Sequence, residues 1–126
     1  MTNTSSNRFT RDNRLLDAAA FGRVFEKASR SRDKLFTVLA RDNDENIARL
    51  GLAISKKHCR RATARNRIKR IIRESFREQQ VQLGGIDVVV INQAAATNAS
   101  NDEIRGSLDR HWRRCSRAKQ ERKTNG

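Results

Sequence analysis

The chain has 126 residues, an apolar fraction of 36% and two cysteines, which fits one small domain without a disulfide framework. Lysine and arginine total 28 against 14 acidic residues, so the formal net charge is +14. Such a charge repels itself and needs an anionic partner, and nucleic acid is the first expectation. An anionic membrane surface is the weaker alternative, because no apolar run approaches the roughly 20 residues of a membrane span and no apolar signal core is present. We therefore expect a cytoplasmic protein.

The amino-terminal part divides into a polar arm and a short helix. Residues 1–13 are polar and are predicted to be a disordered arm. The following segment, 17–28, is predicted to be helical because Phe21, Val24 and Phe25 recur at helical spacing. That periodicity favours a core role for the two phenylalanines, although rings in a basic protein could instead stack on bases.

Two apolar runs then predict strands. Residues 35–40 and 50–55 flank a polar, acidic turn, so we expect them to pair as an antiparallel hairpin. The second run alternates bulky residues (Leu50, Leu52) with small ones (Gly51, Ala53). The small residues predict a shallow sheet face that could hold an extended nucleic-acid strand, or that simply allows a helix to pack closely.

The most basic stretch runs from Lys56 to Arg77 and has a net charge of +9 over 22 residues. From residue 64 it predicts an amphipathic helix, with Thr63 as the expected N-cap and Gly84 and Gly85 as its end. A solvated helix laced by salt bridges is the alternative, but it would need more acids than this stretch contains. The apolar residues that share one arc of the helix are Ile68, Ile71, Ile72, Phe76 and Leu83.

The remaining chain predicts a buried strand and a final helix. Residues 86–91 form a nearly continuous apolar run, typical of a strand buried on both faces. This strand completes a β-α-β unit, whose crossover is statistically expected to be right-handed. Ser100 and Glu103 have the spacing of a capping box that opens the last helix. Its expected core stripe is Ile104, Leu108, Trp112 and Cys115, and its outward arginines are Arg105, Arg110, Arg113, Arg114 and Arg117.

Candidate metal and catalytic residues are sparse. His58, Cys59, His111 and Cys115 could supply a tetrahedral zinc site, but the adjacent pair His58-Cys59 does not suit one metal. The only tight acidic cluster is Asp42, Asp44 and Glu45, and it lies in a turn, which disfavours a nuclease that binds its own metal.

The run Arg65-Asn66-Arg67-Ile68-Lys69-Arg70, preceded by Leu50–Lys57, resembles the signature basic helix and strand of the bacterial ribonuclease P protein subunit. The Phe21-x-x-Val24-Phe25 pattern, the apolar run 86–91 and the Trp112 helix also fit that family. The resemblance covers about residues 8–118. It supports one RNA-binding domain at 14–118, followed by a flexible basic tail at 119–126.

The resemblance implies an α+β fold of order α-β-β-β-α-β-α, similar to the second domain of ribosomal protein S5, with a left-handed β-α-β crossover and a further short strand near 31–34. It also implies a protein that joins a catalytic RNA in a 1:1 complex and binds the 5′ leader of precursor tRNA. Removal of that leader would be Mg²⁺-dependent hydrolysis carried by the RNA, with no organic cofactor and no catalytic residue in the protein.

Carried over by position, the resemblance implies roles for particular residues. Phe21, Phe25 and Phe36 would line the leader groove, and the absence of tyrosine leaves any tyrosine stacking role there unfilled. The residues expected to contact the RNA subunit are Arg65, Asn66, Arg67, Lys69, Arg70 and Arg73, with Lys56, Lys57, Arg60 and Arg61 on phosphates near the same junction. A ribosomal RNA-binding protein and a DNA-binding module that uses the same helix are the rival hypotheses.

Overall fold

The computed structural model describes residues 28–43 and 46–125, and of residues 120–125 only the backbone. The predicted arm 1–13 and the helix with Phe21 and Phe25 lie outside the described residues. The elements, in chain order, are β1 (Ser29–Arg32), β2 (Phe36–Asp42), β3 (Arg49–Ala53), α2 (Ala62–Gln79), β4 (Ile86–Asn92), the 3₁₀ helix η3 (Ala94–Asn98) and α3 (Asn101–Asn125).

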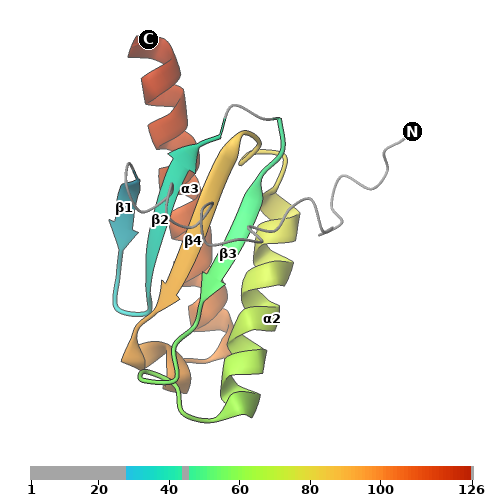
Figure 1. The fold of residues 1–126 in the computed structure, drawn as a ribbon, viewed down its shortest axis with the longest axis vertical. Helices are drawn as coiled ribbons and strands as arrows, with labels where there is room; N and C mark the ends of the chain where they lie inside the picture. Colours follow the sequence, from blue (N-terminus) through green and yellow to red (C-terminus); the bar gives the residue numbers. More distant parts are fainter. Residues whose placement is uncertain (1–27, 44–45, 126) are drawn as a thin grey trace, which may run out of the picture.

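The four strands form one mixed sheet in the order β1-β2-β4-β3 (Figure 1). Strand β4 lies in its centre, antiparallel to β2 and parallel to β3. The predicted hairpin between the second and third strands is therefore wrong, because β4 is inserted between them. Its apolar residues are buried from Ile86 to Val90, and burying such a strand on both faces releases more free energy than a two-stranded hairpin would.

The α+β class expected from the family resemblance is confirmed. A β-α-β unit joins β3, α2 and β4, and both long helices pack on one side of the sheet (Figure 1). The short additional strand lies at Ser29–Arg32, slightly earlier than expected. The left hand of the crossover stays a prediction. Helix α3 continues to Asn125, past residue 118 where the sequence places the end of the domain.

The main core lies between the sheet and the helices. Strand alternation points Phe36, Val38 and Val90 toward α2 and α3. The ring of Phe76 meets that of Trp112 edge to face at 5.7 Å, a favoured aromatic geometry. The indole Nε1 of Trp112 donates to Ser75 Oγ at 2.8 Å, which satisfies the polar atom that its burial would otherwise leave unpaired.

A second, smaller apolar cluster lies on the opposite face of the sheet. Its buried members are Leu39 and Val89, and Ala28, Ala53 and Ile91 pack beside them. The small residues of β3 thus face away from α2 and α3, as the alternation in the sequence predicts. Neither α2 nor α3 covers this face, which is called the open face below, although the side chains of Leu39 and Val89 are buried on it.

The helix ends agree only in part with those predicted from the sequence. The capping box is confirmed: Glu103 N–H donates to Ser100 Oγ at 3.1 Å, and Ser100 N–H donates to Glu103 Oε1 at 2.8 Å. The expected N-cap Thr63 is wrong, because α2 begins after Arg61 and has no side-chain cap. At its other end α2 stops at Gln79, and Gly85 with φ 83° turns the chain into β4.

A buried polar cluster fastens α3 to the edge strand β1. The imidazole of His111, fully buried, contacts Ser31 Oγ through Nδ1 at 2.6 Å. Arg114 Nη1 donates to the same Ser31 oxygen at 3.0 Å. The other ring nitrogen of His111, Nε2, lies 3.3 Å from Asp33 Oδ2 without the alignment of a hydrogen bond. The cluster places two titratable groups between α3 and the sheet.

This environment lowers the pKa values of both Asp33 and His111. Burial alone would raise the pKa of Asp33, but hydrogen bonds from Ser107 Oγ and from the backbone N–H groups of Phe36 and Leu35 outweigh burial. The pKa of Asp33 is lowered to about 2. Burial lowers the pKa of His111 from its ordinary 6.5, and the nearby Asp33 carboxylate offsets only part of that effect.

We expect the free energy of unfolding to decrease as the pH falls below 6.5, the ordinary pKa of histidine. The native state binds the His111 proton less readily than the unfolded chain does, so this stability is complete above that pH and is lost below it. Urea unfolding between pH 8 and 5 should show a smaller decrease for His111→Gln than for wild type. His58→Gln, which removes the other histidine, is the matched control and should keep the decrease; equal pH profiles for all three proteins would contradict the assignment.

Candidate nucleic-acid interface

The basic segment 56–77 folds as a loop followed by α2, and its two sides separate as predicted. Ile68, Ile71, Ile72 and Phe76 are buried against the sheet and α3. The cations with the greatest exposure are Lys56, Lys57, Arg60, Arg61, Arg70, Arg73 and Arg77, while Arg65, Arg67 and Lys69 are partly exposed. The amphipathic helix is therefore confirmed.

No acid among the described residues neutralises this surface. Within the part of the chain that the structure describes, none of the ten cations of segment 56–77 forms an ion pair. Glu74, the one acid in the segment, turns instead to α3 and meets Arg105 at 3.1 Å. The alternative of a surface laced by internal salt bridges is contradicted. Cations three and four residues apart repel one another, so a surface of this kind is suited to an external polyanion.

Two of the arginines have a second role inside the protein. Arg65 Nη1 donates to the carbonyls of Cys59 at 3.0 Å and Arg60 at 2.7 Å, which holds the basic loop against α2. Arg67 Nη1 donates to Asn101 Oδ1 at 2.7 Å, and its Nη2 lies 3.3 Å from two carbonyl oxygens of the η3–α3 junction. Sequence reasoning missed these bonds because carbonyl acceptors leave no signature in the amino-acid sequence.

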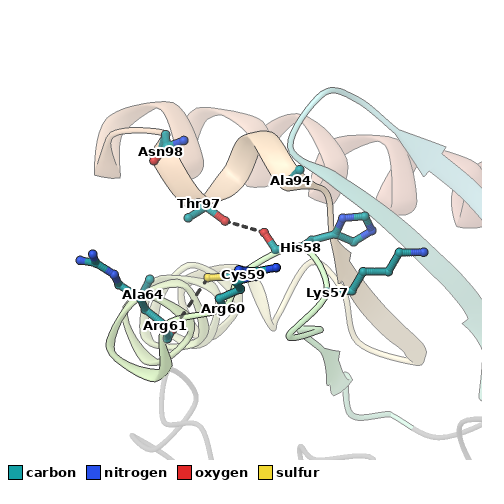
Figure 2. Close-up of a pocket in the computed structure, with 9 residues that line it drawn as sticks. All are labelled: Lys57, His58, Cys59, Arg60, Arg61, Ala64, Ala94, Thr97 and Asn98. Carbon is teal, nitrogen blue, oxygen red and sulfur yellow. Dashed lines mark hydrogen bonds between the residues drawn. The ribbon is translucent and has the colours of Figure 1, made fainter.

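The basic loop, the start of α2 and η3 enclose an open hollow with a volume of about 670 Å³ (Figure 2). Thr97 Oγ1 donates to the carbonyl of His58 at 2.8 Å, which joins η3 to the loop across the hollow. The first turn of α2 has no acid and no side-chain cap, so its first backbone N–H groups have no side-chain partner. The lining residues are Lys57, His58, Cys59, Arg60, Arg61, Ala64, Ala94, Thr97 and Asn98.

The predicted groove residue Phe36 requires a correction. Its ring is fully buried and packs in the main core. The alternation of β2 directs it toward the helices, so it presents no surface to a base on the open face. Phe36 is a core residue, and the prediction that it lines the leader groove is wrong. The predictions for Phe21 and Phe25 fall outside the described residues.

The candidate metal ligands do not converge. Among residues 28–43 and 46–119, no three His, Cys, Asp or Glu side chains are grouped so that they could hold a metal ion. Cys59 and Cys115 are buried free thiols on different elements. Asp42 lies at the end of β2, whereas its sequence neighbours Asp44 and Glu45 are outside the described part. The zinc site that the two histidines and two cysteines could have supplied is therefore not formed in that part.

The described part of the chain also has no helix that is long and apolar enough to cross a membrane. A mixed sheet backed by two helices places this chain in the α+β class. The ten cations on α2 and the loop before it, which no acid of the described residues neutralises, give it a surface suited to a polyanion.

The chain belongs to the ribonuclease P protein family, whose family model matches residues 9–116. It is 49% identical over 112 residues to the ribonuclease P protein component of Methylococcus capsulatus, covering 86% of this chain and 88% of that relative. The RNase P protein of Staphylococcus aureus superposes with a TM-score of 0.73 and 31% identity, covering 78% of this chain and 90% of that one. The RNase P protein of Thermotoga maritima superposes with a TM-score of 0.67 and 29% identity, covering 75% of this chain and 89% of that one.

Membership of this family makes the chain a ribonuclease P protein component, a subunit of a ribonucleoprotein endoribonuclease with a role in tRNA 5′ processing. Its partners are an RNA subunit and precursor tRNA. The unneutralised cations of segment 56–77 are suited to such partners, because a phosphate backbone supplies the negative charge that the protein lacks.

Replacing Arg67 should destabilise the protein, whereas replacing the neighbouring Arg70 should not. Arg67→Met removes three hydrogen bonds that join α2 to the η3–α3 junction, and it should lower the free energy of unfolding by about 1 kcal/mol, or Tm by roughly 3–6 °C. Arg70 is exposed, so Arg70→Gln is the matched control and should melt like wild type. Thermal unfolding by circular dichroism tests this, and identical Tm values for all three proteins would show that the Arg67 bonds contribute nothing.

Proposed function

We propose that this chain binds the catalytic RNA of ribonuclease P and the 5′ leader of precursor tRNA, and so promotes removal of the leader. The observation that carries the proposal is the row of exposed cations on α2 and its preceding loop, none of which pairs with an acid in the described part of the chain. Binding of cations to phosphates releases counterions, and this release supplies most of the affinity for nucleic acid.

The RNA subunit is the proposed partner of α2 and the basic loop. Arg70 and Arg73 project from the exposed side of α2, and Lys57, Arg60 and Arg61 surround the hollow at its start. Arg65 and Arg67 hold the loop and η3 in position while they add charge to the same surface. Asn66, Lys56 and Lys69 belong to the same continuous interface in this proposal. The order of these groups along one helix suits a strand of phosphates better than a single small anion.

The leader is proposed to lie on the open face of the sheet. Gly51 and Ala53 make that face shallow beside Leu39 and Val89, and they lie on the opposite side of the sheet from α2. An extended single strand suits a shallow surface, and the rings of Phe21 and Phe25 from the first predicted helix would stack on its bases. The two RNAs would therefore occupy different faces of the protein and could bind together.

The protein would assist the reaction by electrostatics. Hydrolysis of the phosphodiester bond is proposed to depend on Mg²⁺ held by the RNA subunit, which would activate the attacking water. The cations of the protein reduce phosphate repulsion between the RNA subunit and the precursor, so less Mg²⁺ is needed for assembly. We place one protein with one RNA subunit in the cytoplasm.

The deciding experiment is cleavage of precursor tRNA at low Mg²⁺, with the protein alone, the cognate RNA subunit alone, and both together. Cleavage at the mature 5′ end only when both are present is expected. Cleavage by the protein alone would overturn the proposal and direct attention to its acids. If addition of the protein does not change the cleavage rate, the proposal fails and a general structural RNA-binding role replaces it.

We expect Arg70→Gln combined with Arg73→Gln to weaken binding to the RNA subunit without lowering Tm. Loss of two phosphate contacts should reduce the magnitude of the slope of log affinity against log salt by about 1.4–1.8. Near 0.1 M salt this corresponds to roughly 25- to 60-fold weaker binding. The matched control is Lys34→Gln with Gln82→Glu, which removes the same net charge at exposed sites outside the interface. Equal weakening by both pairs would mean that only overall charge matters, and equal affinity for duplex DNA would favour the DNA-binding rival.

A further inference from the structure

A second set of arginines lies on α3, away from the interface described above. Arg110, Arg113, Arg114 and Arg117 follow the spacing i, i+3, i+4, i+7 and therefore share one side of the helix. All four side chains are exposed. They are called the α3 arginine stripe below. The stripe covers eight residues, or about 10 Å of helix.

The stripe faces away from α2. Helix α3 meets α2 through Arg105, which pairs with Glu74, and through Trp112, which bonds Ser75. The stripe lies on another side of α3, because Arg114 reaches Ser31 of β1 at 3.0 Å. One RNA helix lying along the α2 surface would therefore not cover the stripe as well, and the protein carries two separate cationic surfaces.

The intramolecular partners of the stripe are too few to explain it. Arg110 lies 3.8 Å from Asp33, and Arg114 bonds Ser31. Arg113 and Arg117 make no hydrogen bond or ion pair within the described part of the chain. The negative end of a helix attracts cations only within its last turn. Since α3 continues to Asn125, Arg117 lies two turns before that end, and helix polarity does not account for the stripe.

The chemistry of the stripe selects a duplex backbone as its ligand. Sites for single strands place aromatic rings where bases can stack. The Phe and Trp side chains of the described residues, Phe36, Phe76 and Trp112, are all buried in the core. Four guanidinium groups on a convex helix can contact phosphates and read their spacing, which is how double-stranded RNA is recognised. The stripe is also on the helix-covered side of the sheet, opposite the open face proposed for the leader.

We infer that the α3 arginine stripe binds the phosphate backbone of a second double-stranded segment of the RNA subunit, distinct from the segment bound by α2. This inference rests on the proposed function. The protein then bridges two segments of one RNA, with α2 and α3 as the two sides of the bridge. The bridge would hold the RNA subunit in a compact arrangement when little Mg²⁺ is present.

The test measures binding of the cognate RNA subunit, without precursor tRNA, to the full-length protein carrying Arg113→Gln and Arg117→Gln. We expect roughly 25- to 60-fold weaker binding near 0.1 M salt and a salt slope reduced by about 1.4–1.8. Hydroxyl-radical footprinting should show loss of protection in one RNA segment that the Arg70→Gln/Arg73→Gln protein still protects. Arg113→Lys with Arg117→Lys keeps the charge and should retain most of the affinity and the footprint.

The control pair Lys34→Gln/Gln82→Glu separates a local contact from net charge, and affinity equal to that control would overturn the inference. Weaker binding of precursor tRNA to the assembled complex, with unchanged affinity for the RNA subunit, would also overturn it, because the stripe would then contact substrate. If the α2 variant weakens assembly and the α3 variant does not, only this inference fails. If wild-type protein does not bind the RNA subunit, the proposed function fails together with it.

Discussion

Burial of β4 in the centre of the sheet is the constraint on which the rest of the structure depends. Val88, Val89 and Val90 are fully buried, so both faces of this strand are covered. The strand can occupy that position only if β2 and β3 separate to pair with its two edges. The connection between the parallel strands β3 and β4 must then cross one face of the sheet, and α2 provides it. The apolar side of α2 is held inward by that crossing, which leaves its cations outward.

The arginines illustrate how one residue type serves two purposes. Arg65 and Arg67 bond backbone carbonyls and fix the relation between the loop, α2 and η3, while Arg70 and Arg73 remain exposed. The guanidinium group is suited to the first task because its planar fork can reach several acceptors at once. A surface of this kind is largely formed before its ligand arrives, so less conformational entropy is lost on binding.

Local patterns in the sequence were sufficient for the elements and insufficient for their pairing. The stripe of Ile68 and Ile72, the Ser100–Glu103 capping box and the apolar run of β4 each depend on neighbours in the chain, and each was predicted correctly. Strand pairing depends on residues some 40 positions apart, so the hairpin prediction was wrong. The groove role of Phe36 came from the family resemblance, and the local sequence gave no check on it. Leu35, Phe36, Val38 and Leu39 put apolar residues on both faces of β2, so periodicity does not assign Phe36 to a face.

The same limit applies to the interface. The ten cations and the scarcity of acids among them were visible in one segment, but the pairing of Glu74 with Arg105 of α3 was not. The hollow at the start of α2 was equally hidden, because η3 closes it from a distant part of the chain. The family resemblance supplied the roles of residues that local physics left open, and those roles remain proposals.

The parallel arrangement of α2 and α3 has one more consequence. Bonds join Arg67 to Asn101 near the start of both helices and Lys119 to the Gly84 carbonyl near their far ends, so the two axes run in the same direction. Their peptide dipoles therefore add, and both positive poles lie beside the basic loop. Asp102 and Glu103 balance the pole of α3, whereas the first turn of α2 has no acid. The protein thus neutralises one of two adjacent poles by itself and leaves the other for an anion from outside.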